Sequence, residues 1–134
     1  MTEIVKIGHT DFEFPEEMST GIKGMPKMDA FYTADKCYPE LREDLPRDDL
    51  DIEGAYLIYS NEGDVGMMFS GAPCQCVIVW MDPKKDYHLI WYTEVSNYET
   101  TRRRILRECT CDGINLIETF VRVTEELGRE QWRV

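Results

Sequence analysis

The sequence has few of the side chains that enzymes most often use for proton transfer, since His9 and His88 are its only histidines. It also lacks a glycine-rich phosphate loop, the H-E-x-x-H zinc motif and the G-x-S-x-G nucleophile elbow. Without a catalytic motif, the sequence predicts a protein that is not an enzyme.

Long apolar runs are missing too. No stretch approaches the roughly 20 apolar residues of a membrane-spanning helix. The segment Met1–Lys6 lacks the basic start and apolar core of a signal peptide. We therefore expect a cytoplasmic protein that does not bind membranes, with its five cysteines reduced.

Basic residues are scarce and unevenly placed. The chain of 134 residues has 15 Lys and Arg against 26 Asp and Glu, a net charge of −11. Residues 1–64 hold 16 acids against 6 bases, whereas residues 65–134 hold 10 against 9. Binding to nucleic acid is disfavoured, because it depends on Lys and Arg that neutralise phosphates. An acidic surface favours a basic protein partner instead.

The middle of the chain alternates short apolar segments with Gly, Pro, Asn and Asp, which form turns. Such short connections predict an antiparallel, up-and-down β-meander over residues 54–95. Its expected strands are Ala55–Ser60, Val65–Ser70, Cys74–Met81 and Tyr87–Val95.

The predicted strands are apolar on both faces, which an antiparallel sheet with one face in water would not be. In Cys74–Met81, for example, Ile78 lies on one face and Val77 and Val79 on the other. The sheet therefore needs two covers. C-terminal helices can supply one, and the other comes from the N-terminal half, a bound partner or a second subunit. The last option predicts a homodimer through an apolar sheet face.

The N-terminal half is predicted to be acidic and rich in loops. It contains candidate strands at Glu3–Gly8, Asp11–Phe14 and Met28–Thr33, and a candidate helix at Cys37–Arg47. No linker divides it from the meander, so we expect one domain over residues 1–134.

Two helices are predicted after the meander. Ser96 and Glu99 fit a capping box for a helix over residues 97–109. Asp112 is the expected N-cap of a second helix over residues 113–127, and Gly128 follows its end. The predicted fold class is α+β, an antiparallel meander of four to six strands with two C-terminal helices packed on one face.

The leading functional hypothesis is a protein–protein interaction domain that binds, and inhibits, a basic macromolecular partner. Small size and acidity are shared with immunity and counter-defence proteins. The acids proposed for the contact come from the acidic run Pro39–Glu53: Glu43, Asp44, Asp48, Asp49 and Asp51.

Two alternatives stay open. A small-ligand or nucleotide-binding domain would use the only basic cluster, which consists of Arg102, Arg103, Arg104 and Arg107. A zinc-stabilised domain would use two C-x-C pairs, Cys74, Cys76, Cys109 and Cys111. The pair spacing is shorter than in most zinc sites, and no cofactor is predicted.

Overall fold

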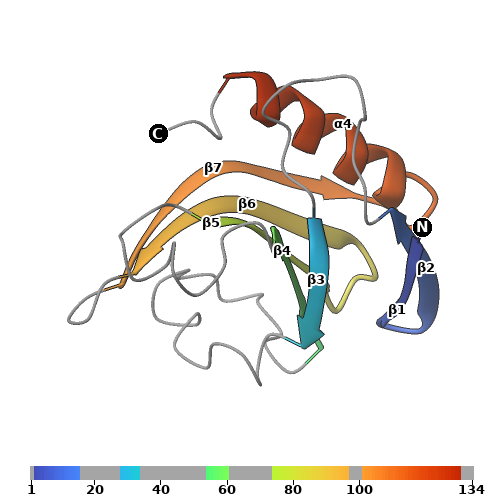
Figure 1. Ribbon diagram of the computed structural model, residues 1–134. Helices are drawn as coiled ribbons and strands as arrows, with labels where there is room; N and C mark the ends of the chain where they lie inside the picture. The colour runs from blue at the N-terminus through green and yellow to red at the C-terminus, as the bar shows by residue number, and fades with distance from the viewer. Residues whose placement is uncertain (1, 16–27, 34–53, 61–73, 97–100, 131–134) are drawn as a thin grey trace.

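A computed structural model of the chain describes residues 2–15, 28–33, 54–60, 74–96 and 101–130, which form seven strands and one helix (Figure 1). The strands are β1 (Thr2–Ile7), β2 (Thr10–Pro15), β3 (Met28–Thr33), β4 (Tyr56–Ser60), β5 (Cys74–Met81), β6 (Tyr87–Ser96) and β7 (Thr101–Cys111). The helix is α4 (Leu116–Glu130), and it lies over one face of the larger sheet. The predicted α+β class is therefore confirmed.

The larger sheet has five antiparallel strands in the order β3-β4-β5-β6-β7, so each strand pairs with its neighbour in sequence. The predicted antiparallel, up-and-down meander is therefore confirmed in character, but not in its strand order. The strands β4 and β5 pair directly, so the strand expected at 65–70 does not lie between them, and the sheet extends beyond residues 54–95 to β3 and β7. The strands expected at 55–60, 74–81 and 87–95 match β4, β5 and β6 to within a residue at each end. The strand expected at 65–70 and the helix expected at 37–47 lie outside the described residues.

A separate two-stranded hairpin is formed by β1 and β2, in agreement with the strands expected at 3–8 and 11–14. Its turn consists of Gly8 and His9. Gly8 has a φ of +67°, and a type II′ turn needs a positive φ at its first central residue. A side chain at Gly8 would also collide with Met81.

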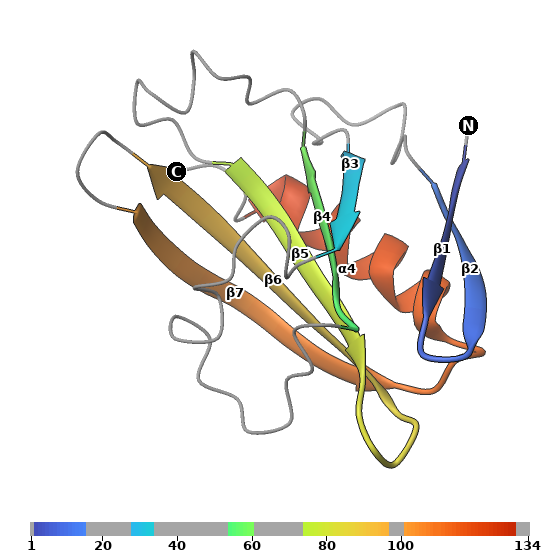
Figure 2. The ribbon, with the colours of Figure 1, turned by 90° about the horizontal axis from the view of Figure 1, so that it is seen from below.

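The hairpin alternates in the manner of a half-buried sheet. Its inward residues are buried, namely Val5, Ile7, Phe12 and Phe14. The Phe14 ring packs edge-on against Phe120 of α4, with ring centres 5.1 Å apart. The hairpin thereby closes one end of the core beside the helix (Figure 2).

The helix α4 packs its apolar side onto the sheet. Its buried residues recur at helical spacing, namely Leu116, Phe120, Val123 and Leu127. They share one core with alternate residues of β5 and β6, including Val77, Val79, Leu89 and Trp91. Trp91 Nε1 also donates a hydrogen bond of 2.9 Å to Thr124 Oγ1 in α4.

The start of α4 agrees with its predicted cap. The Asp112 carboxylate accepts a hydrogen bond of 2.9 Å from the backbone N–H of Asn115, three residues later. Residues 113–115 form a turn, so the helix begins three residues after the expected position. The helix predicted over 113–127 is thus confirmed with shifted bounds, since α4 also continues through Gly128, which was expected to follow its end, to Glu130.

The face of the sheet opposite α4, here called the second face, is buried as well. Its buried apolar residues are Leu57, Cys76, Ile78, Trp80, Ile90 and Tyr92. They are buried within a single chain, so these side chains are not left open for a second subunit. The homodimer was predicted because one apolar sheet face needed a cover, and that argument no longer applies. The homodimer itself stays a prediction.

The helix predicted over residues 97–109 is wrong where the structure describes it. Residues 101–111 form β7, which pairs with β6 along its whole length. Ser96 does not cap a helix but ends β6, opposite Thr101. Ile105 of β7 is 43% exposed.

Two physical causes favour the strand. The segment contains the β-branched residues Thr101, Ile105 and Thr110, which favour strands, and Cys109 and Cys111, which have low helix propensity. Pairing with the long strand β6 also satisfies backbone groups that β6 would otherwise expose. Apolar spacing alone does not distinguish these cases, because it fits a helix as well.

In the part of the chain that the structure describes, no helix is long and apolar enough to cross a membrane.

Candidate functional site

The five acids proposed to contact a partner lie outside the described residues: Glu43, Asp44, Asp48, Asp49 and Asp51. Their role stays a prediction from the sequence.

The four predicted anion-binding arginines are divided between the two faces of β7. Arg103 lies on the second face, directly across from Glu94 of β6. Its Nε atom is 2.7 Å from Glu94 Oε1, and the two side chains are only 3% and 2% exposed. Arg103 is therefore part of a buried ion pair and is not presented to solvent.

The other arginines of the cluster lie on the α4 side of β7. Arg107 forms an ion pair with Glu126 of α4, which also lies 3.5 Å from Arg122. The hydrogen bond from Arg107 is the main cause that lowers the pKa of Glu126. Arg102 and Arg104 are exposed. The structure therefore does not bring the four guanidinium groups together.

The cysteines do not converge either. Cys76 lies on the second face, in register with Tyr92 of β6. Cys109 and Cys111 lie on the α4 side, where burial raises the pKa of both thiols. The side chain of Cys74 is not among those described. Within the described residues, no three His, Cys, Asp or Glu side chains are grouped to hold a metal ion.

The second face differs from the α4 side in its chemistry. Cross-strand register brings buried titratable groups onto it, namely the Glu94–Arg103 pair and His88. Burying an ion pair costs several kcal/mol of desolvation per ion by order of magnitude, and a close partner returns part of it. An apolar core would avoid that cost. The buried ion pair therefore makes the second face the better candidate for a functional site.

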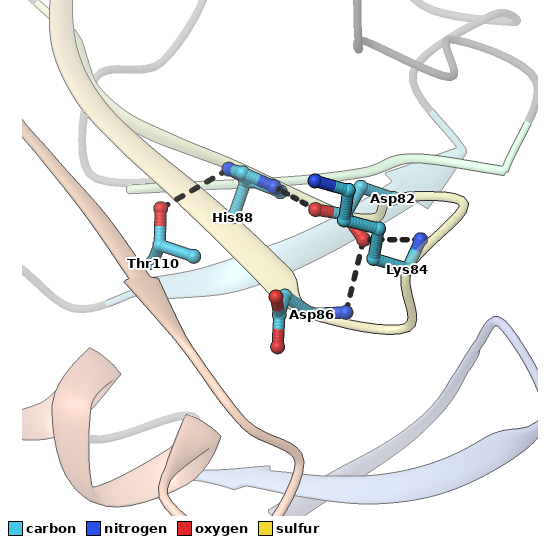
Figure 3. Close-up of polar contacts among 5 residues, drawn as sticks. All are labelled: Asp82, Lys84, Asp86, His88 and Thr110. Carbon is cyan, nitrogen blue, oxygen red and sulfur yellow. Dashed lines mark hydrogen bonds and ion pairs between the residues drawn. The ribbon is translucent and has the colours of Figure 1, made fainter.

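The best-defined polar cluster on this face surrounds His88 (Figure 3). His88 Nε2 lies 2.7 Å from Asp82 Oδ2, and Nδ1 lies 3.2 Å from Thr110 Oγ1. The imidazole also stacks on Trp80, with ring centres 5.1 Å apart and planes 12° from parallel. Three neighbouring strands thus contribute to one cluster, since Trp80, His88 and Thr110 are successive cross-strand partners.

Asp82 links this cluster to the turn between β5 and β6. Its Oδ1 atom accepts hydrogen bonds of 2.8 Å and 3.0 Å from the backbone N–H groups of Lys84 and Asp86. Lys85 has a φ of 70°, a strained value that this turn holds in place. The hydrogen bond from His88 is the largest cause that lowers the pKa of Asp82, and the backbone donors act in the same direction.

The chemistry of the cluster follows from its proton positions. An ionised carboxylate only accepts hydrogen bonds, so His88 Nε2 carries a proton toward Asp82. In the neutral imidazole, Nδ1 then accepts the hydroxyl proton of Thr110. A hydroxyl, an imidazole and a carboxylate in this order also occur in enzymes that activate a nucleophile. Here the carboxylate also accepts from two turn amides, which is the arrangement of a structural clamp between the turn and the sheet.

Sequence reasoning identified the members of this cluster only in part. The sequence predicts a turn between the strands 74–81 and 87–95 and places His88 on the second of them, but it places Thr110 just after a predicted helix over 97–109. Its position opposite His88 depends on the register of β7. A prediction of β7 as a strand, paired in this register, would have placed Thr110 on the same sheet face as His88.

No protein-family model matches the chain, and neither the curated proteins nor the solved structures contain a significant match.

Proposed function

We propose that the chain is a non-catalytic, cytoplasmic interaction domain that binds a basic macromolecular partner, and inhibits it. The proposed contact is the acidic run of the N-terminal half, namely Glu43, Asp44, Asp48, Asp49 and Asp51. The observation that carries the proposal is the set of acids that form ion pairs with arginines of the C-terminal half. Arg103 pairs with Glu94, and Arg107 pairs with Glu126. Both acids belong to the C-terminal half.

The excess of acids in residues 1–64 is 16 against 6 bases, and these two ion pairs do not draw on it. The contacts described for Arg103 and Arg107 therefore join residues of the C-terminal half. Like charges that lack counter-charges repel one another, and a basic partner relieves that repulsion. Covering a basic surface of the partner is also how an acidic protein of this size would inhibit it.

The test is a comparison of two variants with the same net charge. In the first, Glu43, Asp44, Asp48, Asp49 and Asp51 are replaced by Lys. In the second, five exposed acids of the described elements are replaced by Lys, namely Glu3, Asp11, Glu13, Asp86 and Glu118. Five reversals of two units each take the net charge from −11 to −1 in both variants.

Affinity capture from the cells that encode the protein, with quantitative mass spectrometry, should recover a basic protein with the wild type. The control variant should retain it, and the first variant should lose it by at least about tenfold, since each lost charge contact contributes up to roughly 1 kcal/mol. Raising the salt concentration should weaken the complex. Equal recovery with both variants, or a captured partner that is not basic, would contradict the proposal.

A second candidate is the small-ligand or nucleotide-binding domain, favoured by the second face. There the ring of Trp80 stacks on His88, and Tyr92 and the Glu94–Arg103 pair lie further along β6 on the same face. Ligand sites commonly combine aromatic and polar groups in this way. Ligand binding at such a face would depend less on salt than binding through the acidic run. The zinc-stabilised domain predicts unfolding by a chelator, which neither of the other candidates does.

A further inference from the structure

The strand β7 forms one edge of the five-stranded sheet (Figure 2). It has 11 residues and is the longest described strand. Its inner side pairs with β6, and no other described strand pairs with its outer side. An edge strand presents unpaired backbone N–H and C=O groups, to which a further strand can be added.

The side chains of β7 make this edge basic. Residues 101–107 contain four arginines and no acid. Arg103 and Arg107 are held in ion pairs with Glu94 and Glu126, as described above. Arg102 and Arg104 are exposed, and no contact within the described residues holds either of them.

A β-bulge places these arginines on one face. Arg104 lies opposite Thr93, and Arg107 lies opposite Trp91, so the stretch between them has one extra residue. Arg102 and Arg104 therefore share the α4 side of the sheet with Arg107. Alternate residues of a strand are about 7 Å apart, which is also the spacing of alternate side chains in an incoming strand.

We propose that the outer edge of β7 binds an extended acidic segment of a partner protein, which adds to the sheet as a sixth strand. Alternate carboxylates of that segment would lie beside Arg102 and Arg104. The interaction is independent of the acidic-half proposal, because it uses a different surface and a partner segment of opposite charge. A second copy of this chain fits less well, since two antiparallel β7 strands would bring arginines together.

The test uses a fluorescein-labelled peptide in which Glu and Thr alternate, with binding followed by fluorescence anisotropy at low salt. The variant R102E/R104E removes the proposed contact. The control K6E/K84E makes the same change in net charge at two exposed lysines outside β7. Wild type and control should bind the peptide alike, and R102E/R104E should bind on the order of tenfold more weakly.

A second peptide separates strand addition from charge attraction alone. It is methylated at alternate backbone nitrogens, on the peptide edge that would pair with β7. Strand addition predicts that methylation removes binding, because it blocks the backbone donors. If R102E/R104E does not fold by circular dichroism, R102Q/R104Q replaces it and should weaken binding in the same direction.

Three results would overturn the proposal. Equal weakening by K6E/K84E would show attraction to bulk charge only. Unchanged affinity for the methylated peptide would show side-chain contact without strand addition. A dimer of the protein alone that R102E/R104E dissociates would assign the edge to a second copy.

Discussion

At the scale of single residues, Asp82 joins the turn between β5 and β6 to the sheet. Its carboxylate accepts from two backbone N–H groups of its own turn and from His88 on the sheet. One side chain therefore fixes the strained turn and also orients the imidazole. A residue with two such roles should be visible in the pH dependence of stability.

The variant D82N should be less stable than the wild type at neutral pH, and the difference should shrink in acid. The folded protein lowers the pKa of Asp82, so the contribution of this carboxylate is present above the pKa of the unfolded chain. It is lost as the pH falls through the lower pKa of the folded state. Urea unfolding of both proteins at pH 7 and at about pH 3 measures this difference.

The matched control is D86N, which removes an exposed carboxylate from the same turn but keeps the backbone donor to Asp82. Its stability should follow that of the wild type at both pH values. An equal loss in D86N, or a difference for D82N that persists unchanged in acid, would mean that the Asp82 contacts do not stabilise the fold.

At the scale of elements, the β6–β7 ladder determines which side chains meet. It opposes Glu94 to Arg103 and His88 to Thr110. The sequence predicts β4, β5, β6 and the second helix well, because apolar runs and turn residues mark them clearly. It does not predict β7, because Arg, Leu, Glu and Cys at mixed spacing fit a helix equally well. The buried ion pair is missed for the same reason, since only the register brings its two members together.

The Glu94–Arg103 pair offers a test of the ladder. Removing one member of a buried ion pair typically costs about 3–5 kcal/mol, so E94Q and R103M should each strongly lower the free energy of unfolding. The double variant E94Q/R103M should lose less than the sum of the two single losses. Urea unfolding of the wild type, the two single variants and the double variant gives the coupling free energy between Glu94 and Arg103.

The exposed neighbour provides the control, since R104M should change the free energy of unfolding by no more than about 0.5 kcal/mol. Purely additive losses from the two positions would contradict a direct Glu94–Arg103 interaction. A large loss in R104M would show that the arginines of β7 stabilise the fold without a buried partner.

At the scale of the whole molecule, the two faces of the sheet have separate roles. The α4 side holds the apolar core with the β1–β2 hairpin, whereas the second face holds the buried titratable groups. Composition alone predicted that both faces would be covered. It could not assign the covers, because apolar residues on a strand do not reveal whether a helix, a loop or another subunit packs on them.

Burial of both faces within one chain predicts a monomer. A C2 dimer that depended on the second face would have to uncover side chains that are already buried, including Trp80, Ile90 and Tyr92. Native mass spectrometry should therefore show one species of 15.7 kDa. A dimer that persists on dilution would contradict this prediction. In that case R102E/R104E would show whether the subunits meet at the β7 edge, and a dimer that survives the substitution would have to use a surface outside that edge.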